Sequence, residues 1–465
     1  MDYYEKNLLL VISLIFITHH LFSQGIGIGT NTPDSSAVLD ITHANKGLLI
    51  PRMSTTSINA INIPAKGLLV YDSLINQFKV NIGTPASPNF QPIGPGNAWN
   101  IVGNTGINPA NQFIGNTDNQ PLRFRINNIQ AGELHPATGN IFWGMRSGAA
   151  NTSGFSNVAI GTDALNLNTN KSNLVAVGDS ALFHNGQGSA ASADGINNTA
   201  VGSKSLYSNT KGNSNTSIGE HALFSNTTGN NNTAAGALAL SVNTGGFQNT
   251  AIGNFALQNN TTGSDLTAIG VDALFSNTTG FVNTATGFAA LFSNTTGSFN
   301  TANGEFSLHD NTTGFDNTAV GNFTLQFNTT GSENNALGQQ ALKLNTTGFQ
   351  NTAVGSFSLV NNKTGHDNIA VGLNALVNDT SGNNNTAIGN FAGDLAKADN
   401  NNTFIGFGAN NTSGIALSNS TALGFGSSVT ASNQVRFGNA STTSIGGVVG
   451  YTTLSDGRFK KKYTG

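Results

Sequence analysis

The chain has 465 residues, a formal net charge of −3 and only 9% charged residues, together with 57 glycines, 29 phenylalanines and 10 prolines. This charge balance excludes a basic surface for nucleic acid, and the lack of cysteine excludes disulfides, thiolate nucleophiles and thiolate metal ligands. Disordered chains carry more charge and fewer large apolar residues. The composition therefore favours a stack of short strands and tight turns.

Residues 1–24 form a segment of their own. Lys6 precedes an apolar run, Leu8 to Ile17, and small or polar residues follow it. This order is typical of a cleaved secretory signal peptide, whereas a membrane anchor, the alternative, needs a longer apolar run. We expect residues 1–24 to be a signal peptide, and the mature chain to be exported and to contain no transmembrane segment.

Residues 25–150 have no clean period. Short apolar runs separated by prolines and other turn residues predict a small β unit over residues 25–94 and a second one over residues 95–150. Trp99 and Trp143 lie outside any repeat, and we expect them to fill these units rather than to bind sugar.

Residues 151–440 contain a repeat. The glycine of an Asn-Thr-Ala-Ile-Gly-like pentad recurs at every seventeenth position from Gly202 to Gly406, and the glycine closing Asn-Thr-Thr-Gly keeps the same step from Gly212 to Gly382. A unit of this length is too short for a helical repeat, and Gly, Asn and Thr disfavour helix. The period predicts an all-β fold, a parallel β-solenoid or β-roll whose coils each have two short strands and two corners.

Two apolar positions are expected to fill the interior of each coil. One is the Ile or Val directly before the pentad glycine, and the other is the Leu four positions after it, present from Leu206 to Leu376. Burying one of each contributes roughly 3–6 kcal/mol per coil before conformational entropy is counted. The Ala two positions before the glycine, from Ala234 to Ala387, is expected to face either the opposite wall of the coil or another chain.

Polar residues also recur. Asn stands seven positions after the pentad glycine from Asn209 to Asn362, where Asp379 ends the series, and stacked amides of this kind form hydrogen-bonded ladders. We expect this ladder to be structural rather than a ligand site. Thr286 and Asn303 are the odd members of the Ile/Val position, and we expect partial exposure there rather than an anion site on a trimer axis.

Some pentads resemble the repeated motif in head domains of trimeric autotransporter adhesins: residues 249–253, 385–389 and 420–424, the last followed by residues 432–439. The resemblance covers residues 151–440 and implies a trimeric, left-handed parallel β-roll that presents a binding surface. The period here is a few positions longer than in that family. Because the family's coiled-coil stalk and C-terminal membrane barrel are missing from the sequence, secretion by that route is not expected.

Residues 455–460, Ser-Asp-Gly-Arg-Phe-Lys, resemble the start of the intramolecular chaperone of phage tail fibres and endosialidase-type tail spikes. That domain trimerises its fibre and then cuts itself off, which implies Ser455 as nucleophile and Lys460 as base. Since the chain stops at Gly465, we expect residues 441–465 to be a truncated start of this domain that no longer cleaves. Residues 25–81 also resemble secreted tail-fibre-like proteins of Bacteroidota.

These observations predict a non-enzymatic extracellular fibre or adhesin-like protein at the cell surface, a homotrimer that attaches to a host, matrix or neighbouring-cell ligand. One alternative is a tail-fibre-type precursor with a self-cleaving Ser–Lys endopeptidase. Another is an ice- or carbohydrate-binding solenoid that uses the Thr pairs of Asn-Thr-Thr-Gly. The eight His residues are scattered, so no cofactor or metal site is expected. Recognition is expected at the irregular parts, the loop at residues 185–197 and residues 25–150.

Overall fold

The computed structural model describes residues 25–93 and 113–444, and the chain divides into two compact units, residues 1–114 and 115–465. The expected signal peptide and the expected chaperone start lie outside the described residues, except for residues 441–444. Regular structure in the described part is almost entirely β, with the short helix α2 (Thr55–Asn59) in the first unit. The all-β class expected from the composition is confirmed.

The first unit contains two small sheets. Strands β1 and β2 pair in parallel, and β3 to β6 form a four-stranded sheet in which β4, β5 and β6 are antiparallel neighbours. Ile58 of α2 and Val70 of β4 are buried. The strands are β1 (Ile26–Ile28), β2 (Leu39–Ile41), β3 (Arg52–Met53), β4 (Leu69–Asp72), β5 (Gln77–Asn81) and β6 (Phe90–Pro92).

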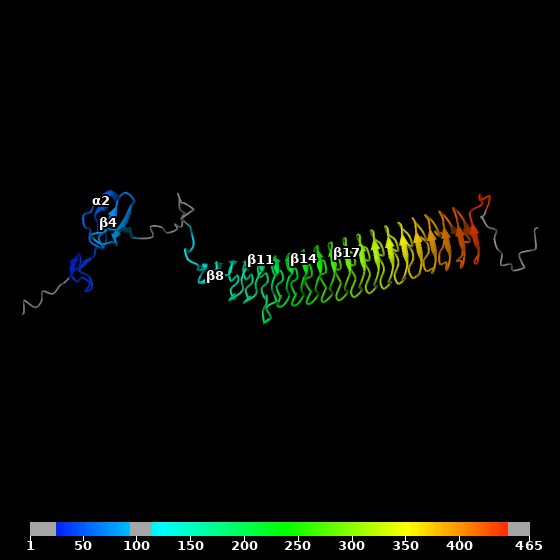
Figure 1. The fold of residues 1–465 in the computed structure, drawn as a ribbon, viewed down its shortest axis with the longest axis horizontal. Helices are drawn as coiled ribbons and strands as arrows, with labels where there is room; N and C mark the ends of the chain where they lie inside the picture. The colour runs from blue at the N-terminus through cyan, green and yellow to red at the C-terminus, as the bar shows by residue number, and fades with distance from the viewer. Residues whose placement is uncertain (1–24, 94–112, 445–465) are drawn as a thin grey trace, which may run out of the picture. The chain divides into compact units, whose positions relative to one another are not determined.

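The second unit is a β-solenoid (Figure 1). It opens with the antiparallel strands β7 (Leu122–Ile126), β8 (Ile129–His135) and β9 (Asn140–Trp143). From β9 onward each strand pairs in parallel with the next. These are β10 (Val158–Ile160), β11 (Val175–Val177), β12 (Thr199–Val201), β13 (Thr216–Ile218), β14 (Thr233–Ala235), β15 (Thr250–Ile252), β16 (Thr267–Ile269), β17 (Thr284–Thr286), β18 (Thr301–Asn303), β19 (Thr318–Val320), β20 (Asn335–Leu337), β21 (Thr352–Val354), β22 (Ile369–Val371), β23 (Thr386–Ile388), β24 (Thr403–Ile405), β26 (Thr421–Leu423) and β28 (Val435–Phe437).

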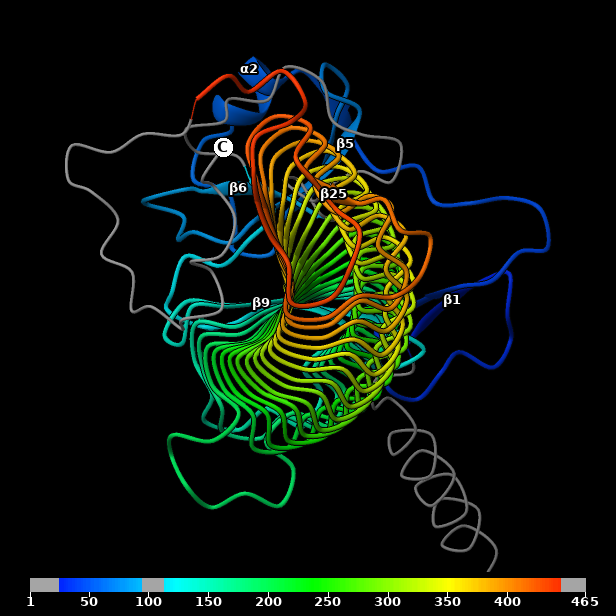
Figure 2. The same cartoon turned by 90° about the vertical axis from the view of Figure 1, so that its right-hand side faces the viewer.

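The register follows the sequence period. Thr250 pairs with Thr267, the equivalent residue of the next repeat, so equivalent residues of successive coils stack in rows. β9 joins the same register as the repeat, and residues 122–143 are therefore continuous with the solenoid rather than a separate body. Viewed along the stack, successive coils rotate progressively in one sense (Figure 2).

Each regular coil has one short strand, so the expected second strand is wrong. Its place is taken by residues with left-handed backbone, such as Phe255 (φ 61°) and Leu257 (φ 54°), which cannot belong to an extended strand. The left-handed conformation costs a non-glycine residue on the order of 1 kcal/mol. Complete burial of Leu257 offsets this cost, and its N–H still donates to Ala273 O of the next coil at 3.0 Å.

The last two coils are exceptions to this rule. β26 and β28 are closer in sequence than the other neighbouring strands, since Thr421 pairs with Val435. Here a second strand does form, β27 (Ser428–Val429), paired in parallel with β25 (Asn410–Asn411).

The interior is narrower than the sequence suggested. Ala251 and Leu257 are completely buried, as are their equivalents along the stack, which confirms the Leu row and places the Ala row inside against the opposite wall. The assignment of the Ile/Val row to the interior is wrong: Ile252 is 42% exposed and Leu337 is 50% exposed. Successive side chains of a strand point to opposite faces, so an inward Ala forces both of its neighbours outward. In the same outward row, Asn303 is exposed and Thr286 is half-buried, in line with the partial exposure expected for them.

The expected asparagine ladder is present and fully buried. Each amide donates through Nδ2 to the Oδ1 of the equivalent Asn in the preceding coil, for example Asn243 to Asn226 at 2.8 Å, and to the carbonyl three positions ahead, Gly246 O, at 3.0 Å. A Cβ on Gly246 would collide with backbone of the next coil and with Asn243, so this position needs glycine. The sequence contains a second buried asparagine row that we did not predict, formed by the first residue of most pentads, where Asn249 N–H donates to Asn232 Oδ1 at 3.0 Å; Leu174 and Leu266 interrupt it.

Asp379 ends the first ladder. It is fully buried and has no amide to offer to Asn362 Oδ1, which instead accepts from Gly365 N–H. Burial raises the pKa of Asp379 to about 6, and the nearby carboxylate of Asp399 adds to this rise, while hydrogen bonds from Gly382 N–H and Ser381 N–H oppose it. Burial also raises the pKa of Asp399.

Because Ala251 faces inward and Ile252 faces outward, substitutions at these two adjacent residues should change stability by different amounts. Ala251→Leu should destabilise the solenoid by about 1–3 kcal/mol, because the interior has no space for the added atoms. Ile252→Leu, which conserves volume on the outer side, should change stability by less than half as much. Thermal unfolding followed by circular dichroism checks this, and equal losses in the two variants would contradict the assignment.

Asp379, which ends the ladder, should make the stability of the chain depend on pH. The folded chain protonates Asp379 near pH 6 and the unfolded chain near the ordinary value of 3.8, so stability from this group is lost as pH rises from about 4 through 6. Asp379→Asn, which restores the ladder residue, should be more stable than the parent at pH 7.5 by roughly 1–3 kcal/mol, and this advantage should shrink at pH 5.

The matched control is Asn345→Asp, which interrupts the ladder in the middle of the stack and should show the opposite sign at pH 7.5. Unfolding temperatures at the two pH values measure both variants. A constant advantage of Asp379→Asn from pH 5 to 7.5 would refute the account of the ladder end.

Candidate self-association surfaces

The outward side of the solenoid sheet is an uninterrupted surface without charge. We call it the sheet face and define it by the first and third residues of strands β9 (from Ile141), β10 to β24, β26 and β28. The third residues form the row Trp143, Ile160, Val177, Val201, Ile218, Ala235, Ile252, Ile269, Thr286, Asn303, Val320, Leu337, Val354, Val371, Ile388, Ile405, Leu423 and Phe437. No Asp, Glu, Lys or Arg occurs in it.

The first residues of these strands form a parallel row that is also uncharged. It is apolar at both ends and almost entirely Thr between them: Ile141, Val158, Val175, Thr199, Thr216, Thr233, Thr250, Thr267, Thr284, Thr301, Thr318, Asn335, Thr352, Ile369, Thr386, Thr403, Thr421 and Val435. β-Branched side chains of this kind suit a pleated surface that is covered.

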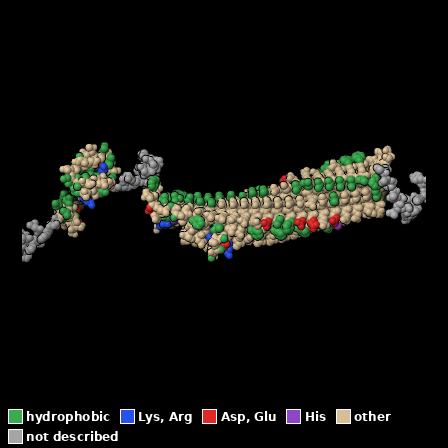
Figure 3. Space-filling view, viewed as in Figure 1, with side chains coloured by type: hydrophobic (Ala, Val, Ile, Leu, Met, Phe, Trp, Pro, Cys, Tyr) green, Lys and Arg blue, Asp and Glu red, His purple; other side chains and the backbone are tan. Residues whose placement is uncertain are grey.

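Charged side chains of the coils lie elsewhere. Asp265, Asp316 and Asp367 stand five positions before a pentad glycine, outside the strands, and are exposed. Figure 3 shows hydrophobic side chains aligned in rows along the stack and acidic side chains gathered in a separate row. The sheet face therefore combines regular apolar exposure with a complete lack of charge, which is typical of a surface that another protein covers.

The first unit also exposes large apolar side chains. Leu48 and Leu49 are 63% and 71% exposed, and with Tyr71 and Phe78 they border a hollow of about 300 Å³. Tyr71 and Phe78 contact each other edge to face, with ring centroids 5.2 Å apart. A unit of this size with so little apolar core and so much apolar surface is a candidate for assembly with further copies.

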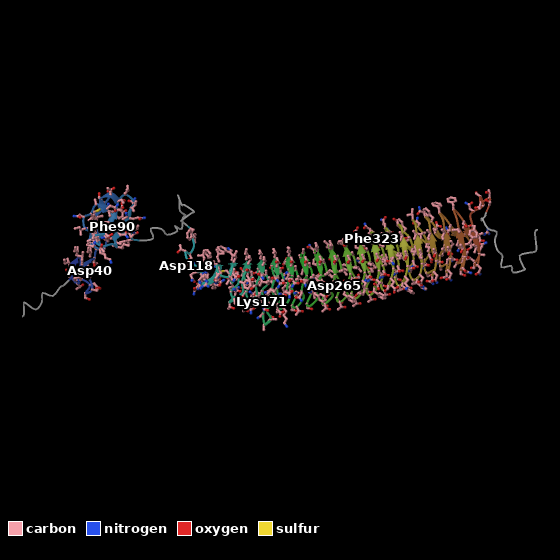
Figure 4. All side chains as sticks on the ribbon, viewed as in Figure 1. Asp40, Phe90, Asp118, Lys171, Asp265 and Phe323 are labelled. Carbon is pink, nitrogen blue, oxygen red and sulfur yellow. The ribbon has the colours of Figure 1, made fainter. Side chains whose placement is uncertain are left out.

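The loop at residues 185–197 leaves the stack between β11 and β12, whose register it does not disturb (Figure 2). Lys171 anchors it. The ammonium donates to Ser189 O at 3.2 Å and to Ala191 O at 2.7 Å, and the side chain is almost completely buried. Figure 4 labels Lys171 at the side of the stack from which this loop departs.

Lys171 occupies the position at which later coils have the glycine of Asn-Thr-Thr-Gly. Its carbonyl accepts from Asn168 Nδ2 at 3.1 Å, as Gly246 O accepts from Asn243. Elsewhere a Cβ at this position would collide with the following coil. Here the chain of the following coil leaves the stack as the 185–197 loop, and the Lys171 side chain lies against Gly186 and reaches into this loop.

The sequence-predicted catalytic pair, Ser455 and Lys460, lies outside the described residues. Over residues 25–93 and 113–444, no three His, Asp or Glu side chains lie where they could hold one metal ion. In the same part of the chain, no helix is long and apolar enough to cross a membrane.

One part of the chain matches a known family. Residues 27–106 match the family described as phage tail like trimerisation region. This match covers β2 to β6 of the first unit and none of the solenoid. No curated protein matches the chain. A trimerisation region followed by a long solenoid is the organisation of a fibre-type structural protein, whereas the resemblances to adhesin heads and to the tail-fibre chaperone remain predictions.

The Lys171 anchor predicts a local effect. Lys171→Met keeps most of the side-chain volume but removes the two hydrogen bonds to the loop, so residues 187–194 should lose protection in hydrogen exchange by roughly tenfold or more. Strands β15 to β23 should be unaffected. Lys363→Met, at an exposed turn, is the control, and equal protection of the loop in both variants would show that Lys171 does not hold it.

Proposed function

We propose that this protein is a non-enzymatic, extracellular homotrimeric fibre, in which three parallel chains associate through their first units and pack their sheet faces against one another along the solenoid. The single observation that carries this proposal is the uncharged sheet face, which continues without a charged residue from β9 to β28.

Two further features support three copies in particular. Residues 27–106 match a trimerisation family, which supports three copies rather than another number. The alternation of each strand gives a second reason: the middle residue, Ala in most coils, faces inward, so the β-branched residues on either side of it face outward and are buried further only by another chain. Burial at about 25 cal/mol per Å² of apolar surface, repeated over every coil, stabilises such an assembly strongly.

The proposed role of the fibre is attachment to a cell or matrix surface. A long, twisted and regular stack offers the same few side chains in every coil, and the parts that differ from the repeat are the Lys171-anchored loop and the N-terminal end of the solenoid. These parts are the proposed recognition regions, and the regular coils hold them at a distance from the anchoring surface.

A second candidate uses the same face in a different way. The Thr row of the strands, from Thr199 to Thr318, is in register and evenly spaced, and a free array of this kind would suit binding to ice. The progressive rotation of the coils in Figure 2 disfavours a flat array, however. Thermal hysteresis in the purified protein would support this candidate, and a covered sheet face would exclude it.

The fibre proposal predicts the mass and the response to charge. The purified chain should sediment with the mass of three copies. Ile252→Lys/Ile269→Lys places six ammonium groups in a trimer between packed faces, so this variant should dissociate or unfold at a temperature several degrees below the parent.

Thr262→Lys/Thr279→Lys is the matched control, because it adds the same charge at exposed turn positions of the same two coils. Its dissociation temperature should equal that of the parent. Sedimentation velocity at increasing temperature checks both variants, and either a monomeric parent or two variants with the same loss would overturn the proposal.

A further inference from the structure

A row of aromatic side chains lies outside the sheet face, at the turn before each strand. It is formed by the residue directly after each glycine of the Asn-Thr-Thr-Gly series, and we call it the turn row. Over seven successive coils Phe and Ser alternate in it: Phe247, Ser264, Phe281, Ser298, Phe315, Ser332 and Phe349. The four rings are 40% to 46% exposed, whereas the serines are buried. The rings therefore recur every second coil, roughly 10 Å apart at about 4.8 Å per coil.

The serines leave the space between the rings open. Ser264 Oγ accepts from Phe247 N–H at 3.1 Å and donates to Thr262 O at 3.3 Å, so its hydroxyl is bound to the backbone. Ser332 Oγ makes the equivalent two bonds, to Phe315 N–H at 3.1 Å and to Thr330 O at 3.3 Å. Two rings that are two coils apart, with only a serine between them, leave a gap about one aromatic ring thick.

The coil after Phe349 shows what fits beside such a ring. His366 occupies the turn row there, and its ring stacks on Phe349 with centroids 4.6 Å apart and an interplanar angle of 6°. Its Nδ1 donates to the carboxylate of the next residue, Asp367 Oδ2, at 2.7 Å. A planar nitrogen-containing group is thus held by a phenyl face on one side and by a carboxylate at its edge.

Two of the serine coils have the same carboxylate but no ring. Asp265 follows Ser264 and Glu333 follows Ser332, at the position of Asp367, and both acids are exposed. We call these two gaps the slots. Each slot has a Phe on either side and one carboxylate at its rim: Phe247, Phe281 and Asp265 in the first, and Phe315, Phe349 and Glu333 in the second.

The third gap, at Ser298, differs. Its next residue is Phe299 rather than an acid, and this ring packs edge to face on Phe281 with centroids 5.0 Å apart. The Ser298 gap is therefore no slot, and it serves as a built-in comparison for the other two.

The surroundings of the slots are acidic. The row that follows the turn row reads Gln248, Asp265, Val282, Phe299, Asp316, Glu333, Gln350 and Asp367, so neither row contains Lys or Arg between residues 247 and 367. Glu333 accepts only from a neutral group, Gln350 Nε2, at 2.9 Å. In Figure 3, hydrophobic side chains also lie beside the acidic row at the lower edge of the stack. A second copy of the chain would bring the same negative charges to this surface, whereas a cationic group complements it.

We propose that each slot binds the guanidinium of an arginine side chain from a partner protein. The guanidinium stacks between the two Phe rings, as His366 stacks on Phe349, and its N–H groups donate to Asp265 or Glu333. Guanidinium is planar and weakly hydrated and stacks on aromatic faces, whereas the lysine ammonium is compact and strongly hydrated. The slots are formed by one chain and use no residue of the sheet face, so this inference does not depend on the trimer.

The spacing of the slots limits the partner further. Ser264 and Ser332 are four coils apart. At about 4.8 Å per coil the slots are separated by roughly 19 Å, which an extended segment spans with two arginines about six residues apart. The partner is therefore a protein with an exposed, arginine-containing segment rather than a single small cation.

The test is a fluorescence-anisotropy titration of the full chain, at physiological salt, with labelled octapeptides of arginine, lysine and citrulline. Octa-arginine should bind roughly tenfold or more tightly than octa-lysine, because only guanidinium stacks well, and than octa-citrulline, which is planar but uncharged. Octa-lysine binding as tight as octa-arginine binding would reduce the surface to a general cation attractor. That result, or no binding of octa-arginine, would overturn the proposal.

Filling the slots tests the stacking. Ser264→His/Ser332→His introduces the ring seen at His366 in both slots, so octa-arginine affinity should fall to that of octa-lysine, which should not change. Ser298→His makes the same change in the gap without a carboxylate and should leave both affinities unchanged. Thermal unfolding confirms that both variants fold. Unchanged octa-arginine binding in the filled variant would contradict the proposal.

A second pair of variants tests the carboxylates without altering the packing. Asp265→Asn/Glu333→Gln should weaken octa-arginine binding by about tenfold or more. Glu220→Gln/Glu305→Gln removes the same charge at exposed positions outside the two rows and should keep the preference for octa-arginine over octa-lysine. Equal losses in the two double variants would show that only net charge attracts the peptide, and the slots would then have no role.

Discussion

The buried asparagine amides require an equivalent coil on either side of each coil. A fully buried amide needs partners for both its Nδ2 and its Oδ1. In the ladder, the Nδ2 of Asn243 donates to Asn226 of the preceding coil and to the carbonyl of Gly246, and its Oδ1 accepts from Asn260 of the following coil. A longer coil keeps the ladder only when the extra residues loop out of the stack, as in the coil with the 185–197 loop, where Asn209 Nδ2 still donates to Asn185 Oδ1 at 2.8 Å across 24 residues. The period of the repeat is thus maintained by side-chain hydrogen bonds as well as by the backbone pairing of the strands.

The small interior follows from this stacking. The middle residue of each strand faces this interior and is Ala in most coils, so the β-branched residues on either side of it face outward. The same strands therefore stabilise the coil with one side and expose an uncharged apolar face with the other. The fold creates a surface that a further copy can cover, which is why the trimerisation match in the first unit and the sheet face of the second unit support one proposal.

The sequence was sufficient to predict the solenoid, its period, the Leu row and the first asparagine ladder, because each repeats at one spacing and has one physical explanation. It did not show which residues of the pentad face the interior of the coil and which face outward. Ala251 and Ile252 are both apolar, and only the left-handed conformation of Phe255 and Leu257, which has no sequence signal in those residue types, shows how narrow the coil is.

The central claim is that the sheet face lies between copies of the chain. Because the sequence contains no cysteine, a single spin label can be attached at Ile252→Cys or, on an exposed turn, at Thr262→Cys. Electron–electron distance measurement on each labelled protein reports the separation between copies. The account predicts one narrow, short distance at position 252 and a clearly longer one at position 262. No inter-chain distance at position 252, or a shorter distance at position 262, would contradict it.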